Sequence, residues 1–369
     1  MKVCHVCSNY DKFFVDLMEE QILKEIDLRV YYFRAKERGM PEVKAPYLDI
    51  RLNYSNWDRP FFYLKEGKII KDFFNIYKRE QFDIIHAHTL FSNGYVALKA
   101  KKEWGIPYIV AVRDMDLNIF LKYRINLRKL GIEILKEAER IIFISDQYKK
   151  QLVDKYVPSN LKEEFLNKSL IIPNGINEFY LNNIWNKSPK KIEKEINVIT
   201  VGYISKRKNQ LSVCEAIKML NDSGIKVKYT VVGNILDKKI FDKIKEYSFV
   251  TYIPFLTREE LIDEYRKADI FVMPSITETF GLTYVEAMSQ GLPVIYSKGQ
   301  GFDGRFKEGH IGYHVRSKDT KDIANKIIGI TKNYKTISEN CTKESLLFNW
   351  NEISTEYKEI YKDILHNKK

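Results

Sequence analysis

The sequence has 369 residues, a formal net charge of +12 and 44% hydrophobic residues. At roughly 150 residues per domain this length predicts two domains, and the composition excludes a collagen, a coiled-coil rod and a disordered chain. The first apolar stretch is too short for a signal peptide and no apolar run could span a membrane, so we expect a cytoplasmic protein.

The first half of the chain alternates short β-branched or aromatic runs with longer segments of helical period. This order is typical of a parallel sheet covered by helices on both faces. Helices are expected near residues 13–26 and 125–138. The expected strands span residues 2–7, 28–34, 83–86, 108–112, 140–145 and 170–173. We assign residues 1–182 to a first domain and the polar, lysine-rich residues 183–195 to a linker.

The same alternation begins again after the linker, in residues 196–344. The expected strands here span residues 197–202, 228–233, 249–254, 269–274, 293–296 and 312–315. Residues 345–369 contain one amphipathic helical stretch, residues 345–365, with no strand after it. The fold class is therefore α/β, with two doubly wound Rossmann-like domains. Because such sheets bind ligands at the carboxyl ends of their strands, the expected site is the cleft between the domains.

Metal ligands are not expected. Cys4 and Cys7 lie within an expected strand, whereas a redox Cys-x-x-Cys pair begins a helix and a zinc site needs a second close pair. His86 and His88 alternate at a strand end, and the pair lacks a nearby third ligand. We interpret one of them as a packed or capping histidine and prefer His88 as a site residue.

The most informative stretch runs from Pro274 to Ile295. An apolar strand ends at its start, a polar loop follows, and a helix opens near Gly281. The free backbone N–H groups of Gly281, Leu282 and Thr283 suit a phosphate or pyrophosphate. Glu286, about one turn into the helix, could accept hydrogen bonds from a ribose diol, and Glu278, before the helix, could hold sugar hydroxyls. This layout predicts a site for a nucleotide sugar.

This stretch resembles the E-x7-E signature of retaining family 4 glycosyltransferases of the GT-B fold, with Glu278 and Glu286 as its acids. The Phe-Gly-Leu, Glu-Ala-Met and Gly-x-Pro-Val-Ile elements are in register. The terminal helix is similar to the one that in this fold crosses back to pack on the first domain. Further similar segments are residues 83–88, 105–107, 138–145, 172–176, 197–208, 268–274 and 299–303.

The resemblance implies transfer of a sugar from a nucleotide donor, expected to be a UDP- or GDP-sugar, to an acceptor hydroxyl with retention. No metal or other cofactor is expected, because positive side chains neutralise the leaving diphosphate. The implied catalytic residues are Lys208, Glu278 and Arg113. The implied donor-binding residues are Glu286, Gly281, Leu282, Thr283, Phe280, Ser8, Asn9, Gly202, Tyr203, Asn234 and Phe255. The implied acceptor-side residues are His88, Asp114 and Asn174.

Three positions depart from the family pattern. Tyr203 stands where relatives carry an arginine that acts with the lysine at Lys208, and Arg207 or Lys206 could take its place. Residues 8–11 contain no glycine, although many relatives have a Gly-Gly there. Arg113 stands where many relatives have a histidine. Because arginine is permanently charged, it cannot act as a base. The absence of a base agrees with a front-face mechanism, in which the departing phosphate takes the acceptor proton.

Two basic, aromatic segments, residues 59–65 and 117–130, suggest a lipid-carried acceptor. The second segment could lie on an anionic membrane with Phe120, Leu121 and Tyr123 in the headgroup region, or could be an amphipathic helix packed on the sheet. Peripheral association with the inner face of the cell membrane and a role in bacterial surface polysaccharide or lipid-linked glycan synthesis are therefore expected.

The expected partners are a nucleotide sugar, a glycan or lipid-linked acceptor and an anionic membrane surface. The alternatives are a nucleotide-sugar epimerase, a degenerate sugar-binding relative, and a nucleic-acid binder prompted by the charge. Nucleic acid is not expected as a partner, because the charge is dispersed along the chain and no zinc-finger spacing or RNP-like motif is present.

Overall fold

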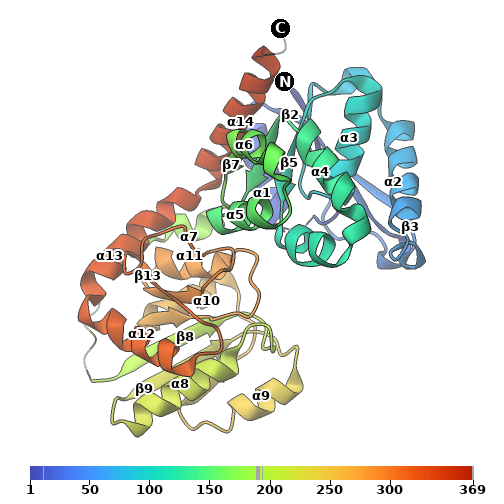
Figure 1. Ribbon diagram of the computed structural model, residues 1–369. Coiled ribbons are helices and arrows are strands. Elements are labelled where there is room, and N and C mark those ends of the chain that lie inside the picture. Colours follow the sequence, from blue (N-terminus) through green and yellow to red (C-terminus); the bar gives the residue numbers. More distant parts are fainter. Residues whose placement is uncertain (11, 188–191, 193, 368–369) are drawn as a thin grey trace. The chain divides into compact units, whose positions relative to one another are not determined.

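The computed structural model describes residues 1–10, 12–187, 192 and 194–367, which form two compact units (Figure 1). The first unit contains Met1–Pro173 and the C-terminal stretch from Trp350, and the second contains Asn174–Asn349. Residues 174–182, grouped with the first domain in the sequence analysis, thus belong to the second unit. Of the expected linker, residues 188–191 and 193 lie outside the described residues, as do residues 368–369 of the C-terminal segment.

The first unit is built on a parallel sheet with the strand order β3-β2-β1-β4-β5-β6-β7. Its strands are β1 (Lys2–Cys7), β2 (Asp27–Ala35), β3 (Leu48–Tyr54), β4 (Ile84–Ala87), β5 (Tyr108–Val112), β6 (Arg140–Phe143) and β7 (Ser169–Ile171). The six expected strands are present with small shifts at their ends. Strand β3 was not predicted, because it lies at the sheet edge, most of its side chains are half-buried, and its sequence, Leu-Asp-Ile-Arg-Leu-Asn-Tyr, is rich in polar residues.

Helices cover both faces of this sheet, with α2 and α3 on one side and α1 and α14 on the other (Figure 1). The helices are α1 (Lys12–Leu23), α2 (Phe62–Ile76), α3 (Ser92–Trp104), α4 (Arg128–Glu137), α5 (Asp146–Lys155), α6 (Lys162–Asn167) and α14 (Trp350–His366), with short helical turns η1 (Lys36–Arg38), η2 (Asn56–Asp58), η3 (Arg79–Gln81), η4 (Asp116–Leu121), η5 (Ile125–Leu127) and η6 (Ser159–Leu161). The helix expected over residues 125–138 begins at Arg128, because the preceding residues form the separate turn η5.

Helix α14 completes the core of the first unit. It packs against α1, and its apolar face lies in one cluster with residues of β1, β2 and β4. The buried residues of that face include Trp350, Ile353, Tyr357, Ile360, Tyr361 and Ile364. The prediction of a single helix over residues 345–365 is wrong at its start. Asn349 is extended (φ −85°, ψ 124°) and separates α14 from the preceding turn.

The second unit has a parallel sheet with the order β10-β9-β8-β11-β12-β13. Its strands are β8 (Ile196–Val201), β9 (Val227–Val232), β10 (Val250–Ile253), β11 (Ile270–Val272), β12 (Val294–Ser297) and β13 (Gly312–Val315). Its helices are α7 (Glu178–Asn182), α8 (Gln210–Asp222), α9 (Lys238–Ile244), α10 (Arg258–Lys267), α11 (Leu282–Ser289), α12 (Thr320–Lys332) and α13 (Tyr334–Ser345), followed by the turn η7 (Leu346–Phe348). In both sheets the order reverses beside the first strand, which is where doubly wound sheets bind ligands.

Candidate functional site

Most of the predicted donor residues gather at one edge of the second sheet. All strands of a parallel sheet end at the same edge, so the loops after β8, β9, β10 and β11 lie there together. Gly202 and Tyr203 follow β8, Asn234 follows β9, Phe255 follows β10 and Glu278 follows β11. The sheet order thus brings together residues that are up to 76 positions apart in the sequence, counted from 202 to 278.

Lys208 and Glu278 form a buried ion pair at this edge. Lys208 Nζ lies 2.7 Å from Glu278 Oε2, and the side chains are 9% and 8% exposed. Ser275 Oγ donates a second hydrogen bond to the same carboxylate oxygen at 3.1 Å. Because each buried charge needs its partner, the two groups hold one another in place. The structure therefore brings together two of the three predicted catalytic residues.

The loop after β12 holds the backbone of Glu278. Glu278 N donates to Gln300 Oε1 at 2.9 Å, and Gly301 N donates to the carbonyl oxygen of Glu278 at 3.1 Å. A Cβ atom on Gly301 would lie 1.7 Å from the carbonyl oxygen of Thr279, so only glycine fits this approach. Residues 299–303 resemble the family from sequence alone, but their hydrogen bonds to the Glu278 backbone were not predicted.

Arg207 supplies a second positive charge beside the ion pair. Its Nη1 donates to the carbonyl oxygen of Thr277 at 2.9 Å and lies 3.7 Å from Glu278 Oε2. Lys206 and Tyr203 are exposed. Of the two cations considered as replacements for the missing arginine, the structure thus places Arg207 beside Glu278.

Helix α11 begins at the same place. Its N-cap, Gly281, has φ +82°, and a Cβ atom there would lie 2.3 Å from the ring of Tyr284. Phe280 is buried, whereas Leu282 and Thr283 are half-buried at the first turn. Because the first N–H groups of a helix have no acceptor within it, this turn can bind an anion.

Glu286 lies on the second turn of α11 and is partly buried. Its Oε2 accepts a hydrogen bond from the hydroxyl of Tyr265 at 3.2 Å. Burial raises the pKa of Glu286 to about 7, against the smaller opposing effects of Tyr265 and Arg258. The carboxyl group therefore exchanges its proton near neutral pH, and a ligand that donates hydrogen bonds to it would favour the ionised form.

A mainly apolar pocket of about 220 Å³ lies next to these groups. It is lined by Val201, Gly202, Tyr203, Val232, Gly233, Asn234, Phe255, Leu256 and Leu261. Gly202 connects it to the ion pair, since a Cβ atom there would lie 3.3 Å from Lys208 Cε. The apolar pocket therefore lies beside the buried Lys208–Glu278 pair.

Two family descriptions together match most of the chain. "Glycosyltransferase Family 4" matches residues 12–178, and "Glycosyl transferases group 1" matches residues 182–345. The chain belongs to the group 1 glycosyltransferases. The resemblance stated from the sequence is therefore confirmed.

Relatives and solved structures agree with this assignment. The alpha-monoglucosyldiacylglycerol synthase of Acholeplasma laidlawii is 25% identical over 73% of this chain and 73% of its own length. The UDP-Gal:alpha-D-GlcNAc-diphosphoundecaprenol alpha-1,3-galactosyltransferase of Escherichia coli is 24% identical over 83% and 81%. Sucrose-phosphate synthase from Thermosynechococcus elongatus matches the structure with a TM-score of 0.76, 18% identity and full coverage of both chains. The predicted GT-B fold, with its two Rossmann-like domains, is confirmed.

The first unit of this glycosyltransferase gathers its predicted residues in the same way. Ser8 and Asn9 follow β1, His88 follows β4, and Arg113 and Asp114 follow β5, so all of them lie at the carboxyl edge of neighbouring strands. His88 is buried, and the other four are partly or fully exposed. This edge is rich in polar groups that could contact a substrate.

Arg113 and Asp114 are held by neighbours that the sequence analysis missed. Asp116 Oδ2 accepts hydrogen bonds from Arg113 N at 2.9 Å and from Leu90 N at 3.0 Å. Asp114 Oδ1 accepts from the hydroxyl of Tyr148 at 3.0 Å. The contact with Leu90 follows from the adjacency of β4 and β5, which the local sequence does not show.

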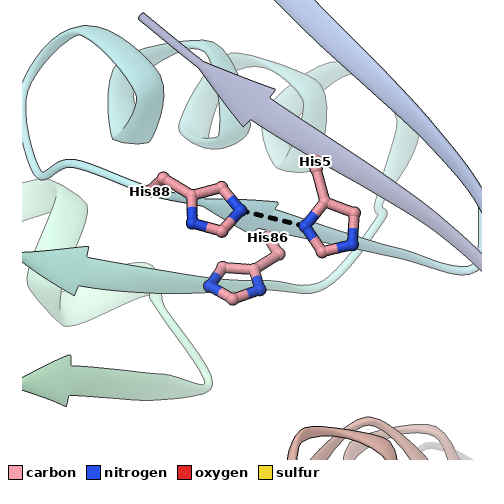
Figure 2. A group of neighbouring side chains, drawn as sticks. All are labelled: His5, His86 and His88. Atoms are coloured by element: carbon pink, nitrogen blue, oxygen red, sulfur yellow. Dashed lines mark hydrogen bonds between the residues drawn. The ribbon is translucent and has the colours of Figure 1, made fainter. Parts of the chain in front are cut away.

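Asn174 and His88 complete the predicted acceptor-side residues. Asn174 is partly buried in the segment between β7 and α7 and belongs to the second unit. The statement that His86 and His88 lack a third ligand is wrong, because His5 joins them in a buried group (Figure 2). Residues 5 and 86 are 81 positions apart, so sequence spacing could not show this.

Proposed function

We propose that this glycosyltransferase takes its sugar from a UDP- or GDP-sugar and transfers it with retention of the anomeric configuration. The observation that carries the proposal is the buried Lys208–Glu278 pair between the apolar pocket and the first turn of α11. The pocket would hold the nucleobase, Glu286 the ribose diol, and the α11 N–H groups the diphosphate. Glu278 would bind hydroxyls of the transferred sugar.

Positive charge in the site supports a metal-independent reaction. As the bond between the sugar and the diphosphate breaks, negative charge develops on the leaving oxygen. Lys208, Arg207 and the N-terminus of α11 are fixed where they could neutralise that charge without reorganising. The leaving phosphate would then take the proton of the acceptor hydroxyl on the same face of the sugar. No side chain acts as a nucleophile in this scheme.

Calorimetry and thermal-shift measurements with UDP, GDP, ADP, CMP and dTDP, each with and without magnesium, test the donor. We expect saturable binding of one diphosphate that magnesium does not change and that Glu286→Ala abolishes. Absence of binding to all five would overturn the proposal and favour a degenerate sugar-binding relative or a nucleic-acid binder. Release of the diphosphate without any acceptor present would instead favour an epimerase-like enzyme.

The affinity for the diphosphate should depend on pH through Glu286. Its pKa of about 7 means that at about pH 6 a proton must leave before the carboxylate can accept hydrogen bonds from the ribose. Between about pH 6 and pH 8 the affinity should therefore rise about 10-fold, with release of a proton on binding.

Calorimetry in buffers of different ionisation enthalpy measures this proton release. The Glu286→Gln variant controls for titration of the nucleotide itself, because it keeps the size of the side chain but cannot ionise. An unchanged pH dependence in this variant would contradict the assigned role of Glu286.

We further propose that the acceptor is lipid-linked or a growing glycan, and that the first unit meets an anionic membrane. Residues 59–65 and 117–130 lie side by side, since Arg124 Nη2 donates to the carbonyl oxygen of Pro60 at 2.7 Å. Large apolar side chains are exposed on both segments, namely Phe61, Tyr63, Leu64, Ile119, Tyr123 and Ile125. Neither segment contains an acidic residue, whereas both contain lysines and arginines. This combination suits an anionic bilayer surface.

The structure changes which residues could enter the headgroups. Leu121 is buried and Phe120 stacks on Phe91 with ring centroids 4.7 Å apart, so two of the three side chains expected to insert belong to the packed side. Tyr123 is exposed, together with Ile125. Among the described residues no helix is long and apolar enough to cross a bilayer.

Sedimentation with anionic vesicles tests the membrane contact. The wild-type protein should sediment with them at low salt, and the Tyr123→Ser/Ile125→Ser variant should bind several-fold more weakly because it loses inserted apolar area. Leu23→Ser removes an even more exposed apolar side chain elsewhere on the first unit and should leave binding unchanged. Wild-type protein that stays in the supernatant would contradict the proposal.

Synthesis of a surface polysaccharide or lipid-linked glycan is the expected biological role. Both relatives described above carry names of enzymes that glycosylate lipid-borne acceptors, which supports this choice. Once a donor is known, the anomeric configuration of the product, measured by nuclear magnetic resonance, decides between retention and inversion.

A further inference from the structure

Three histidines meet on one face of the first sheet. His5 on β1 is the direct register partner of His86 on β4, and His88 lies two residues further along the chain. Side chains two residues apart on an extended chain share a face, so all three rings lie together (Figure 2). Their exposed fractions are 0%, 0% and 2%. We refer to His5, His86 and His88 as the histidine cluster.

The ring nitrogens of the cluster are only partly satisfied. His5 Nδ1 lies 2.9 Å from His88 Nε2, His5 Nε2 lies 2.9 Å from Gln21 Oε1, and His86 Nδ1 lies 2.7 Å from the hydroxyl of Tyr361. Within the described part of the chain, His86 Nε2 and His88 Nδ1 are buried without a hydrogen-bond partner. A buried polar atom without a partner is destabilising, so a ligand for His86 Nε2 would remove a penalty.

The rings are in the form that binds metals. Burial lowers the pKa of His5 to about 3 and lowers the pKa values of His86 and His88 well below their usual range. Near neutral pH all three are therefore uncharged imidazoles, each with one nitrogen lone pair. The lone pair of His5 Nδ1 already accepts the hydrogen bond from His88 Nε2, because His5 Nε2 donates to Gln21 Oε1, so this bond must break before His5 can bind a metal ion.

We propose that the histidine cluster binds one transition-metal ion of the zinc or copper class. One potential ligand nitrogen from each ring lies within 4.8 Å of the others. Two nitrogens that bind one ion at about 2.0–2.1 Å are themselves roughly 3 Å apart. His5 Nδ1 and His88 Nε2 are already 2.9 Å apart, but a hydrogen lies between them, so the proton of His88 must first move to its Nδ1. All-imidazole sites suit Zn²⁺, Cu and Ni²⁺, whereas Mg²⁺ and Ca²⁺ require oxygen ligands.

The surroundings resemble the outer shell of a metal site. A ligating imidazole usually has its second nitrogen held by a neighbouring polar group, and Gln21 and Tyr361 hold His5 and His86 in this way. The rings of His86 and His88 are stacked with centroids 4.1 Å apart, so they must turn before both can bind one ion. Arg113 donates to the carbonyl oxygen of His88 at 3.4 Å, and its charge weakens the site. We therefore expect micromolar rather than tighter affinity.

This proposal is independent of the proposed donor chemistry, since the cluster belongs to the first unit and the Lys208–Glu278 pair to the second. Purified protein without an affinity tag is dialysed against ZnCl₂, CoCl₂ or CuCl₂, and bound metal is measured by mass spectrometry and titration calorimetry. We expect one ion per chain, and for Co²⁺ a visible absorption band that reports nitrogen ligands.

Three variants separate a residue that would bind the metal, a residue that orients it, and an exposed histidine outside the cluster. His86→Asn should remove binding, and Tyr361→Phe, which keeps the ring but loses the hydroxyl, should weaken it by about 10- to 100-fold. His366→Asn, an exposed histidine on α14, should change nothing. If His86→Asn does not fold, the Co²⁺ spectrum of the wild-type protein and the metal affinity of the Tyr361→Phe variant still test the proposal.

The proposal is overturned if the wild-type protein retains far less than one ion per chain, or if His86→Asn or Tyr361→Phe binds metal as well as the wild type. The cluster would then be a metal-free, hydrogen-bonded part of the core.

Discussion

Replacement of Lys208 by methionine is expected to lower kcat by about 10²- to 10³-fold, the usual effect of removing one preorganised group that stabilises transition-state charge. Lys208 Nζ lies 2.7 Å from Glu278 and is the buried cation of the donor site. Methionine keeps most of the apolar stem, is one atom shorter, and removes the charge together with the hydrogen bond to Glu278. Steady-state kinetics with the donor identified by the binding screen measure the loss.

Two further variants separate catalysis from stability. Lys208→Met leaves the Glu278 carboxylate buried without its partner, which costs about 3–5 kcal/mol of unfolding free energy. The double variant Lys208→Met/Glu278→Gln removes both charges, so it should recover most of the stability and none of the activity. Lys206→Met, an exposed neighbour in the same turn, should behave like the wild type. Recovery of activity in the double variant would show that Lys208 acts only on folding.

Gly301→Ala should lower kcat/KM by about 10²-fold, because a shift of about 1 Å in a catalytic group has effects of this size. The new Cβ atom would lie 1.7 Å from the carbonyl oxygen of Thr279, so one of the two backbone segments must move. Either movement disturbs Glu278, because its backbone is hydrogen-bonded to Gly301 and to the side chain of Gln300. The kinetics of transfer and the affinity for the diphosphate measure the change.

Gly304→Ala is the matched control for this substitution. Gly304 lies in the same loop with φ +80°, but no heavy atom lies within 4 Å of its potential Cβ atom. This variant therefore carries only the strain of a left-handed alanine, roughly 1–2 kcal/mol, and should keep its activity within a few-fold. Equal losses in the two variants would show that a general disturbance of this loop, and not the clash with Thr279, is responsible.

The architecture was predictable because buried parallel strands leave a strong signal. Runs such as Tyr108–Val112 are apolar throughout and were located without error. Strand β3 was missed because edge strands are half-exposed and need no continuous apolar run. The start of α14 was misplaced because amphipathic periodicity continues across the break at Asn349. This residue is extended and pairs with Ile176, which is far away in the sequence.

Several residues of the site were predictable one by one, but the contacts between them were not. Glu278 and Lys208 were both named from local motifs, but their ion pair follows from the adjacency of β8 and β11, which no local pattern encodes. For the same reason Gln300 and Ser275, which hold the Glu278 backbone and side chain, were not identified as such. His5 was overlooked because a single histidine in an apolar strand resembles ordinary core filling until the opposite strand is known.

The discontinuous first unit has a consequence for synthesis on the ribosome. Residues up to Pro173 are translated first, but α14, which carries several aromatic residues of their core, is translated only after the whole of residues 174–349. At about 5–20 residues per second this delay is on the order of 10 s or more. During that time the nascent sheet exposes the apolar surface that α14 later covers, so the unit that is made first finishes folding last.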